Sequence, residues 1–216
     1  MSIEHICFDL DGTLVKSNVT IYKATLKTLL ELNIVTGLPE EKFNDMIGMH
    51  FIDMFNELNV NVPDFDEFMK IYKESYFDFI DESDLYPFVE ETLSLLHERK
   101  DLKVSLLTTK GQDQAEKIVR HFDLYKYFDF VMGRREGIPH KPSPEPLLFV
   151  CKNLKVQAEN SMIVGDTELD IQSGRSAGAI TCGVSYGYRT RESLSEHKPD
   201  YLIDNLNELT SILKSN

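Results

Sequence analysis

Positive charge is scarce in this chain. Its 216 residues contain 23 Lys and Arg against 36 Asp and Glu, which gives a formal net charge of -13. Nucleic acids and anionic membrane surfaces are polyanions, so this charge argues against either of them as a partner. It does not exclude a small anionic ligand that is held by a few local cations.

Cysteines and long apolar runs are also scarce. Cys7, Cys151 and Cys182 lie far apart and show no CxxC spacing, which favours a reduced intracellular compartment over a disulfide framework. No basic segment followed by an apolar stretch opens the sequence, and no run approaches 18 apolar residues. We therefore expect a cytoplasmic protein that is neither secreted nor embedded in a membrane.

Short apolar segments alternate with longer segments of helical periodicity. Because several apolar segments lack polar alternation, they are typical of strands buried on both faces of a parallel sheet. The pattern predicts an α/β fold with a Rossmann-like, mostly parallel sheet. The expected strands are 3–8, 103–109, 128–132, 161–165 and 179–185, and the expected helices are 89–100, 113–124, 144–154 (with Ser143 as N-cap) and 168–179.

A helical insertion interrupts this alternation. Residues 15–84 contain no convincing strand and three helical patterns, at 19–34, 39–58 and 63–82. The Phe, Tyr and Met residues at helical spacing in this stretch favour the core of a small bundle over a ligand site. We expect residues 1–14 and 85–216 to form the α/β core and residues 15–84 to form a helical cap.

Two aspartates close the first expected strand, in the segment FDLDGTL (8–14). Residues i and i+2 of a strand project to the same side, so Asp9 and Asp11 can point to one place beyond the strand end. Open α/β sheets bind ligands at that edge, and Gly12 allows the backbone to turn away. Taken alone, the pair is equally consistent with a solvated Asx-turn.

Acids and phosphate-binding side chains also follow other expected strands. Asp166 follows the strand at 161–165, and Asp170 lies four residues later; acids at a helix N-terminus are the alternative interpretation. Carboxylates that converge from two strands favour Mg²⁺, a hard cation that binds oxygen. Thr108 and Thr109 end another strand, and Lys141 precedes a helix. Each has an ordinary alternative, strand propensity for the threonines and a solvated loop for the lysine.

Four motifs occur in the order DLDGT, LLTT, KPSPEP and GDTELD. Together they resemble the haloacid dehalogenase-like hydrolase superfamily, in particular its phosphoglycolate-phosphatase-like branch. The resemblance covers residues 1–14 and about 85–213, and the insertion is similar in place and size to the helical cap of that family. It implies a Mg²⁺-dependent phosphatase that acts on a small phosphorylated metabolite as a monomer or small homo-oligomer.

The resemblance also implies roles for individual residues. Asp9 would attack phosphorus and form an aspartyl-phosphate, and Asp11 would act as acid and then as base. The carboxylates of Asp9 and Asp166 and the main-chain carbonyl of Asp11 would bind Mg²⁺. Thr108, Thr109 and Lys141 would hold phosphoryl oxygens, while Asp170 would order Lys141 or a metal-bound water.

The substrate is less defined by the sequence than the chemistry. Lys16 and the Gly48–His50 turn are our candidates for substrate specificity. A sugar-phosphate mutase, similar to beta-phosphoglucomutase, and a pyrophosphatase are alternatives of the same fold. The first Arg of the chain is Arg99, which argues against a mutase that grips a second phosphate through a cap arginine. A phosphorylatable signalling module is a further alternative, and the second aspartate of DLDGT argues against it.

Overall fold

The computed structural model describes residues 2–215 and divides them into two compact units. The sheet unit consists of residues 2–14 and 85–215, and the helical unit consists of residues 15–84. The chain passes between them at two short paired strands, β2 (Val15–Lys16) and β3 (Asp84–Leu85). None of the helices in residues 2–215 has the length and apolar character that crossing a membrane requires.

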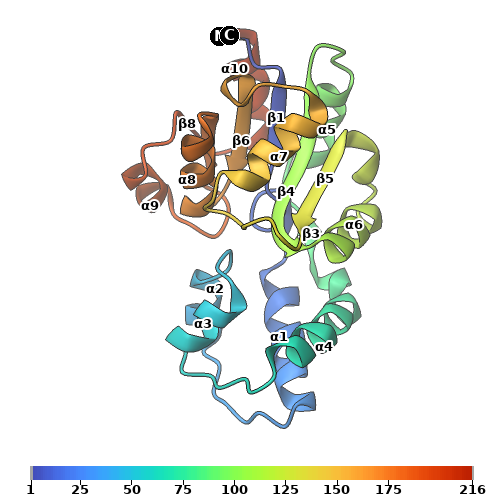
Figure 1. The fold of residues 1–216 in the computed structure, drawn as a ribbon, viewed down its shortest axis with the longest axis vertical. Coiled ribbons are helices and arrows are strands. Elements are labelled where there is room, and N and C mark those ends of the chain that lie inside the picture. The colour runs from blue at the N-terminus through green and yellow to red at the C-terminus, as the bar shows by residue number, and fades with distance from the viewer. Residues whose placement is uncertain (1, 216) are drawn as a thin grey trace. The chain divides into compact units, whose positions relative to one another are not determined.

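A six-stranded parallel sheet forms the centre of the sheet unit (Figure 1). Its strand order is β5-β4-β1-β6-β7-β8, so β1 lies in the middle between β4 and β6. This topology confirms the predicted Rossmann-like α/β fold. The strands are β1 (His5–Phe8), β4 (Lys103–Gly111), β5 (Phe130–Arg134), β6 (Ser161–Gly165), β7 (Ile180–Val184) and β8 (Tyr201–Ile203).

Helices connect the parallel strands, as crossover connections require. Their bounds are α5 (Val89–His97), α6 (Gln112–His121), α7 (Glu145–Leu154), α8 (Glu168–Ala177), α9 (Arg191–Glu196) and α10 (Leu209–Ser215), with short 3-10 helices at Tyr125–Tyr127, Ala158–Asn160 and Leu206–Glu208. The predicted helices are present: α5, α6 and α8 end two or three residues earlier than expected, and α7 ends at Leu154 as expected. Pro144, rather than the expected Ser143, is the N-cap of α7, because the Ser143 hydroxyl accepts only a long bond, 3.4 Å, from the Glu145 amide.

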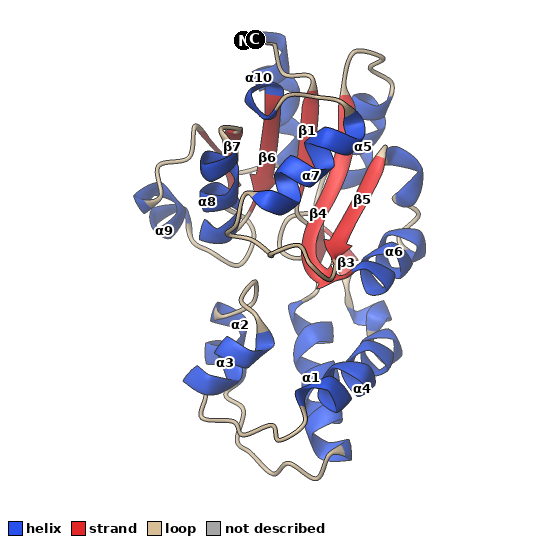
Figure 2. Cartoon of the chain, in the orientation of Figure 1, coloured by secondary structure: helices blue, strands red, loops and turns tan. Residues whose placement is uncertain are grey.

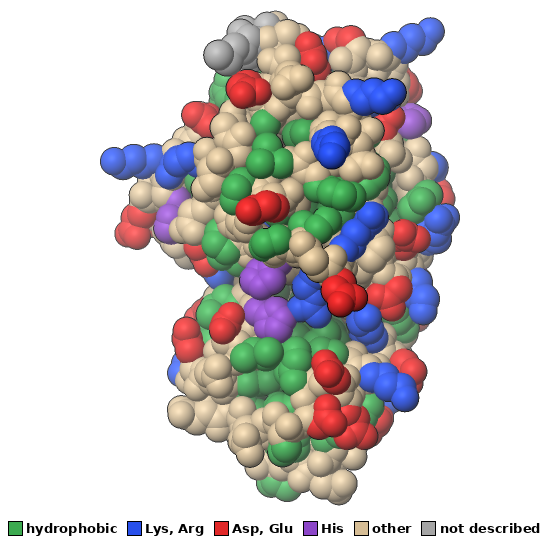
Figure 3. All heavy atoms as spheres, in the orientation of Figure 1, with side chains coloured by type: hydrophobic (Ala, Val, Ile, Leu, Met, Phe, Trp, Pro, Cys, Tyr) green, Lys and Arg blue, Asp and Glu red, His purple; other side chains and the backbone are tan. Residues whose placement is uncertain are grey.

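An apolar layer joins α7 to one face of the sheet. Cys7, Leu107, Met132 and Ile163 project from four adjacent strands into a cluster that includes Leu147, Val150 and Cys151 of α7. Part of α7 faces outward, where Leu148 is 42% exposed. Figure 1 shows α7 in front of the sheet. Figure 3, in the same orientation, shows hydrophobic side chains gathered on this face among scattered charges. Exposed apolar side chains are common on the surfaces of folded proteins.

The helical unit is built around aromatic side chains, which agrees with the predicted bundle core. Its helices are α1 (Asn18–Glu31), α2 (Glu40–Asp45), α3 (Phe51–Glu57) and α4 (Phe65–Asp78), followed by a 3-10 helix at Ile80–Glu82 (Figure 2). The rings of Phe51 and Tyr72 lie 4.7 Å apart, and those of Phe55 and Phe68 lie 5.0 Å apart. Phe68 and Tyr72 are buried.

Other expectations about secondary structure were also wrong. Residues 15–84, where no strand was expected, contain β2 and the first residue of β3, which pair with each other. The helical pattern at 39–58 is two helices, because Gly48 takes φ of 105°, a left-handed conformation that a helix cannot contain. Strand β8 was not expected, since its three residues are too short to show periodicity.

His5 is a buried polar group in the central strand. Its ring contacts the hydroxyls of Ser161 at 3.0 Å and Ser105 at 2.7 Å, on the two neighbouring strands. Burial lowers the pKa of His5 from 6.5 to about 4, although the nearby charge of Asp129 opposes the shift. The folded protein therefore keeps this ring neutral at pH values where the unfolded chain binds a proton.

We expect His5 to make the protein less stable in mild acid. The stabilisation that a neutral His5 provides is complete above pH 6.5 and is lost as the pH falls toward 4, by about 2 kcal/mol at pH 5. Urea unfolding at pH 7 and pH 5 measures it. The His5→Gln variant, whose amide does not titrate, should lose about 2 kcal/mol less than the wild type. An equal loss in both proteins would contradict the assignment.

Candidate active site

The carboxyl ends of three adjacent strands bring the predicted acids and lysine together. Asp9 follows β1, Thr108 lies in β4, and Asp166 follows β6. Because β1 lies between β4 and β6 and all three run parallel, their carboxyl ends share one edge of the sheet. Asp170, in the first turn of α8, and Lys141, in the loop before α7, reach the same edge.

Lys141 is the centre of this arrangement. Its side chain is 3% exposed, and Nζ lies 2.8 Å from Oδ1 of Asp9 and 2.5 Å from Oδ1 of Asp170. The ammonium group also donates to the Leu107 carbonyl at 3.2 Å. Burial alone would lower the pKa of Lys141, but the charges of Asp170 and Asp9 raise it instead. The lysine is therefore a fixed positive charge in the interior.

Asp166 is held by two neighbouring segments, residues 12–13 and 187–188. Thr13 donates its hydroxyl to Oδ1 at 3.1 Å, and the Tyr188 amide donates to Oδ2 at 2.8 Å. Glycines surround this carboxyl group: a Cβ on Gly12 would lie 2.1 Å from Oδ2 of Asp166, and a Cβ on Gly187 would lie 2.3 Å from its Cβ. The carboxylate consequently has a single well-defined position.

The geometry fits a divalent cation. Asp9, Asp166 and Asp170 each offer a carboxylate oxygen, and these oxygens lie within 4.8 Å of one another. Burial raises the pKa of Asp9 to about 7, with Lys141 opposing, and raises the pKa of Asp166 well above its usual range, with the charge of Asp9 adding to the effect. Three buried acids with one lysine lack positive charge, and a hard cation with oxygen ligands such as Mg²⁺ would supply it.

The three acids differ in the hydrogen bonds that they accept. Oδ2 of Asp170 accepts hydrogen bonds from the Thr167 amide at 3.2 Å and the Thr167 hydroxyl at 2.7 Å, and Oδ1 contacts Lys141. These bonds occupy Asp170, whereas Asp9 and Asp166 keep more of their acceptor capacity. Asp9 and Asp166 are therefore suited to bind a cation directly, and Asp170 is suited to orient Lys141.

The remaining predicted residues have different surroundings. Oδ2 of Asp11 lies 3.3 Å from Nζ of Lys110, a largely buried lysine. Thr108 is buried, and Thr109 is half-buried beside it in β4. In the helical unit, Lys16 is exposed in β2 and Gly48 forms the turn before α3. There the imidazole of His50 caps α3, since Nδ1 accepts from the Ile52 amide at 3.3 Å.

Sequence reasoning missed several residues of the site. Thr13 is the last residue of the DLDGT motif and Lys110 directly follows LLTT, but their partners become visible only when separate strands meet. Gly187 had a signal, a glycine between two tyrosines after β7, although nothing in the sequence links it to Asp166. Arg134, at the end of β5, also had no motif to mark it, because a charged dipeptide such as Arg134-Arg135 is typical of a solvated turn.

Comparisons with known proteins agree with the predicted resemblance. A family model for haloacid dehalogenase-like hydrolases matches residues 6–184. The chain is similar to pyrophosphatase PpaX of Bacillus cereus, with 32% identity over 216 residues, 100% of this chain and 98% of that protein. The family inferred from the four motifs is thereby confirmed.

Solved structures show the same fold. A haloacid dehalogenase-like family hydrolase from Streptococcus pneumoniae is similar, with a TM-score of 0.86 and 25% identity over 97% of this chain and 98% of that one. A protein described as a predicted phosphoglycolate phosphatase from Haemophilus somnus has a TM-score of 0.82 and 26% identity over 98% of each chain.

The close approach at Gly187 leads to a prediction about stability. In Gly187→Ala the new Cβ would lie 2.3 Å from Asp166 Cβ and 2.4 Å from the Gly12 carbonyl oxygen, so the backbone must shift. We expect the free energy of unfolding to fall by about 1–3 kcal/mol. The matched control is Gly37→Ala, where a Cβ meets nothing within 4 Å; it should change stability by less than about 0.5 kcal/mol. Urea titration of both variants measures these changes. An equal change in the free energy of unfolding for Gly187→Ala and Gly37→Ala would contradict the close approach.

Proposed function

The chain belongs to the haloacid dehalogenase-like hydrolases, and on this premise we propose that it hydrolyses a small phosphate monoester through an aspartyl-phosphate. The observation that carries the proposal is the position of Asp9. Its buried carboxyl group lies at the carboxyl edge of the sheet, 2.8 Å from the Lys141 ammonium and in one cluster with Asp166. A nucleophilic carboxylate next to a fixed cation is the arrangement that phosphoryl transfer requires.

The first step forms a bond between an Asp9 carboxylate oxygen and phosphorus while the bond from phosphorus to the leaving oxygen breaks. Asp11 gives its proton to the leaving oxygen, and the alcohol departs. Thr108, Thr109 and Lys141 hold the oxygens of the phosphoryl group, and Lys141 offsets part of the charge that develops on them. Asp170 acts through Lys141 by keeping the ammonium group in place.

In the second step Asp11 takes a proton from a water molecule, whose oxygen attacks phosphorus. The bond between phosphorus and Asp9 breaks, which releases inorganic phosphate and restores both carboxyl groups to their initial states. Asp9, Asp166 and the main-chain carbonyl of Asp11 would hold Mg²⁺. When bound, this cation supplies positive charge next to the phosphoryl oxygens.

Inorganic pyrophosphate is a second candidate substrate. The similar protein of Bacillus cereus is named a pyrophosphatase, and the similarity extends over both full lengths. The chemistry at Asp9 would be the same, with phosphate as the leaving group. The leaving group must therefore be recognised by residues outside the catalytic set, and we propose Lys16, Gly48 and His50 of the helical unit for this discrimination.

The Asp9→Asn variant tests the proposed function. The amide has the shape of the carboxylate but is not a nucleophile, so phosphate release should fall by at least about 10³-fold. The assay measures inorganic phosphate from 4-nitrophenyl phosphate and from pyrophosphate in the presence of Mg²⁺, and circular dichroism checks that the variant is folded. A folded variant that keeps more than a tenth of the activity would rule out Asp9 as the nucleophile.

Variants of the helical unit test the specificity residues. We expect Lys16→Ala and His50→Asn to change the ranking among phosphate substrates more than they change hydrolysis of 4-nitrophenyl phosphate. Asn is used at position 50 because it also caps helices and so keeps the bond to the Ile52 amide. An unchanged ranking in both variants would leave these residues with structural roles only.

A further inference from the structure

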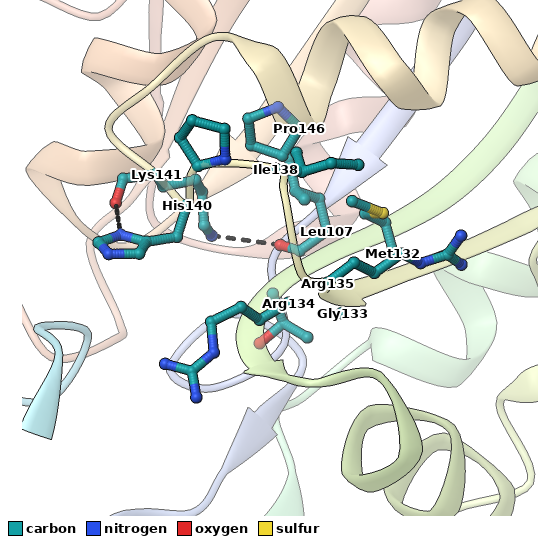
Figure 4. A pocket seen from close by; sticks show the side chains of 11 residues that line it. Leu107, Met132, Gly133, Arg134, Arg135, Ile138, His140, Lys141 and Pro146 are labelled. Carbon is teal, nitrogen blue, oxygen red and sulfur yellow. Dashed lines mark hydrogen bonds between the residues drawn. The ribbon is translucent and has the colours of Figure 1, made fainter.

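A depression in the sheet unit lies beside Lys141. Thr108 and Lys141, two of the proposed phosphoryl-binding residues, line it together with Arg134 and His140 (Figure 4). Two further polar side chains therefore adjoin the place where a phosphoryl group would bind. Neither has a role in the steps proposed above.

The backbone before Arg134 is fixed by close packing. Met132 pairs with Leu107, so the end of β5 runs alongside the segment of β4 that contains Thr108. The Gly133 amide donates to Oε1 of Gln112 at 2.8 Å, and a Cβ on Gly133 would lie 2.5 Å from the Gln112 Cα. Arg134 is the last residue of β5 and therefore starts from a well-defined position at the carboxyl edge of the sheet.

Arg134 and Arg135 point in opposite directions, as Figure 4 shows. Nε of Arg135 donates to Oε1 of Gln112 at 3.0 Å, and its guanidinium lies 5.6 Å from the ring centres of Phe130 and Phe149. Arg135 thus stabilises the packing of β5 against its helices. Arg134 projects away from this aromatic pair and lines the same depression as Lys141.

Two lysines at this edge lie beside acids. Lys141 lies between Asp9 and Asp170, and Lys110 lies next to Asp11. Any anion on the leaving group would add negative charge to an edge that is rich in carboxylates. A further cation at that position would offset it, and the planar guanidinium of arginine can bind phosphate or carboxylate through two parallel hydrogen bonds.

The ring of His140 makes a local contact. Its Nδ1 lies 2.8 Å from the Lys141 carbonyl oxygen, which can only accept, so Nδ1 carries the proton. Arg134 carries the planar guanidinium, which can donate two parallel hydrogen bonds to an anionic group.

We propose that Arg134 binds a second anionic group of the substrate, a phosphate or a carboxylate on the leaving side of the phosphoryl group. This inference rests on the proposed phosphatase function and narrows its substrate class to phosphate compounds whose leaving group is itself an anion. It also assigns part of substrate selection to the sheet unit.

The test compares Arg134→Met with Arg135→Met, which removes the same charge one residue away. Three probes are hydrolysed in the presence of Mg²⁺: pyrophosphate, 2-phosphoglycolate and 4-nitrophenyl phosphate, whose leaving group has no second phosphate or carboxylate. We expect Arg134→Met to lower kcat/KM about 10- to 100-fold for pyrophosphate, for 2-phosphoglycolate or for both, because a charge-assisted hydrogen bond is lost. Its kcat/KM for 4-nitrophenyl phosphate should change less than threefold, and Arg134→Lys should recover part of the loss.

A selective loss for pyrophosphate identifies the second group as phosphate, and one for 2-phosphoglycolate identifies it as carboxylate. An equal loss for all three probes, no loss for any, or the same selective loss in Arg135→Met would overturn the proposal. If the wild type hydrolyses no probe, the phosphatase function fails, and calorimetric binding of pyrophosphate and 2-phosphoglycolate decides the role of Arg134. Binding of either that is at least tenfold weaker in Arg134→Met supports the role, and equal binding of both overturns it.

Discussion

The ammonium group of Lys141 lies 2.8 Å from Asp9 and 2.5 Å from Asp170, and all three residues are buried in the sheet unit. Removing one partner of such a buried pair costs about 3–5 kcal/mol, because the other charge is left without compensation. The loop before α7, the end of β1 and the start of α8 therefore have to stay in one arrangement. This constraint sets where Asp9 points and how much negative charge remains near it.

The order of the strands places the groups that interact with Asp9 on the strands next to it. Because β1 lies in the middle of the sheet, the groups that follow β4 and β6 flank Asp9 on both sides. Gly12 and Gly187 allow their backbone to approach Asp166, which holds its carboxylate next to the Asp9 group. An edge with this density of buried carboxylates lacks positive charge, so the same geometry that orders the acids also favours a divalent cation and a phosphoryl group.

The sequence predicted the parts of this site that lie within single motifs. Asp9, Asp166 and Lys141 could be named because each follows a strand or precedes a helix whose period is visible. The ion pair of Lys110 with Asp11 could not, since it joins two strands that are about 100 residues apart in the sequence, and pairing depends on the register between them. Arg134 carries no such signal, because a charged dipeptide after an apolar segment is typical of a solvated turn. The structure is needed to show that Arg134 and Arg135 point in opposite directions from the end of β5.

The central claim is that the acidic edge is completed by a divalent cation held through Asp9 and Asp166. Isothermal titration calorimetry with MgCl₂ tests it most directly, on the wild type and on Asp166→Asn, which keeps the size of the side chain and removes its charge. The account predicts one Mg²⁺ site in the wild type and binding at least tenfold weaker in the variant. Equal Mg²⁺ affinity in the two folded proteins, or no binding by the wild type at millimolar Mg²⁺, would contradict it.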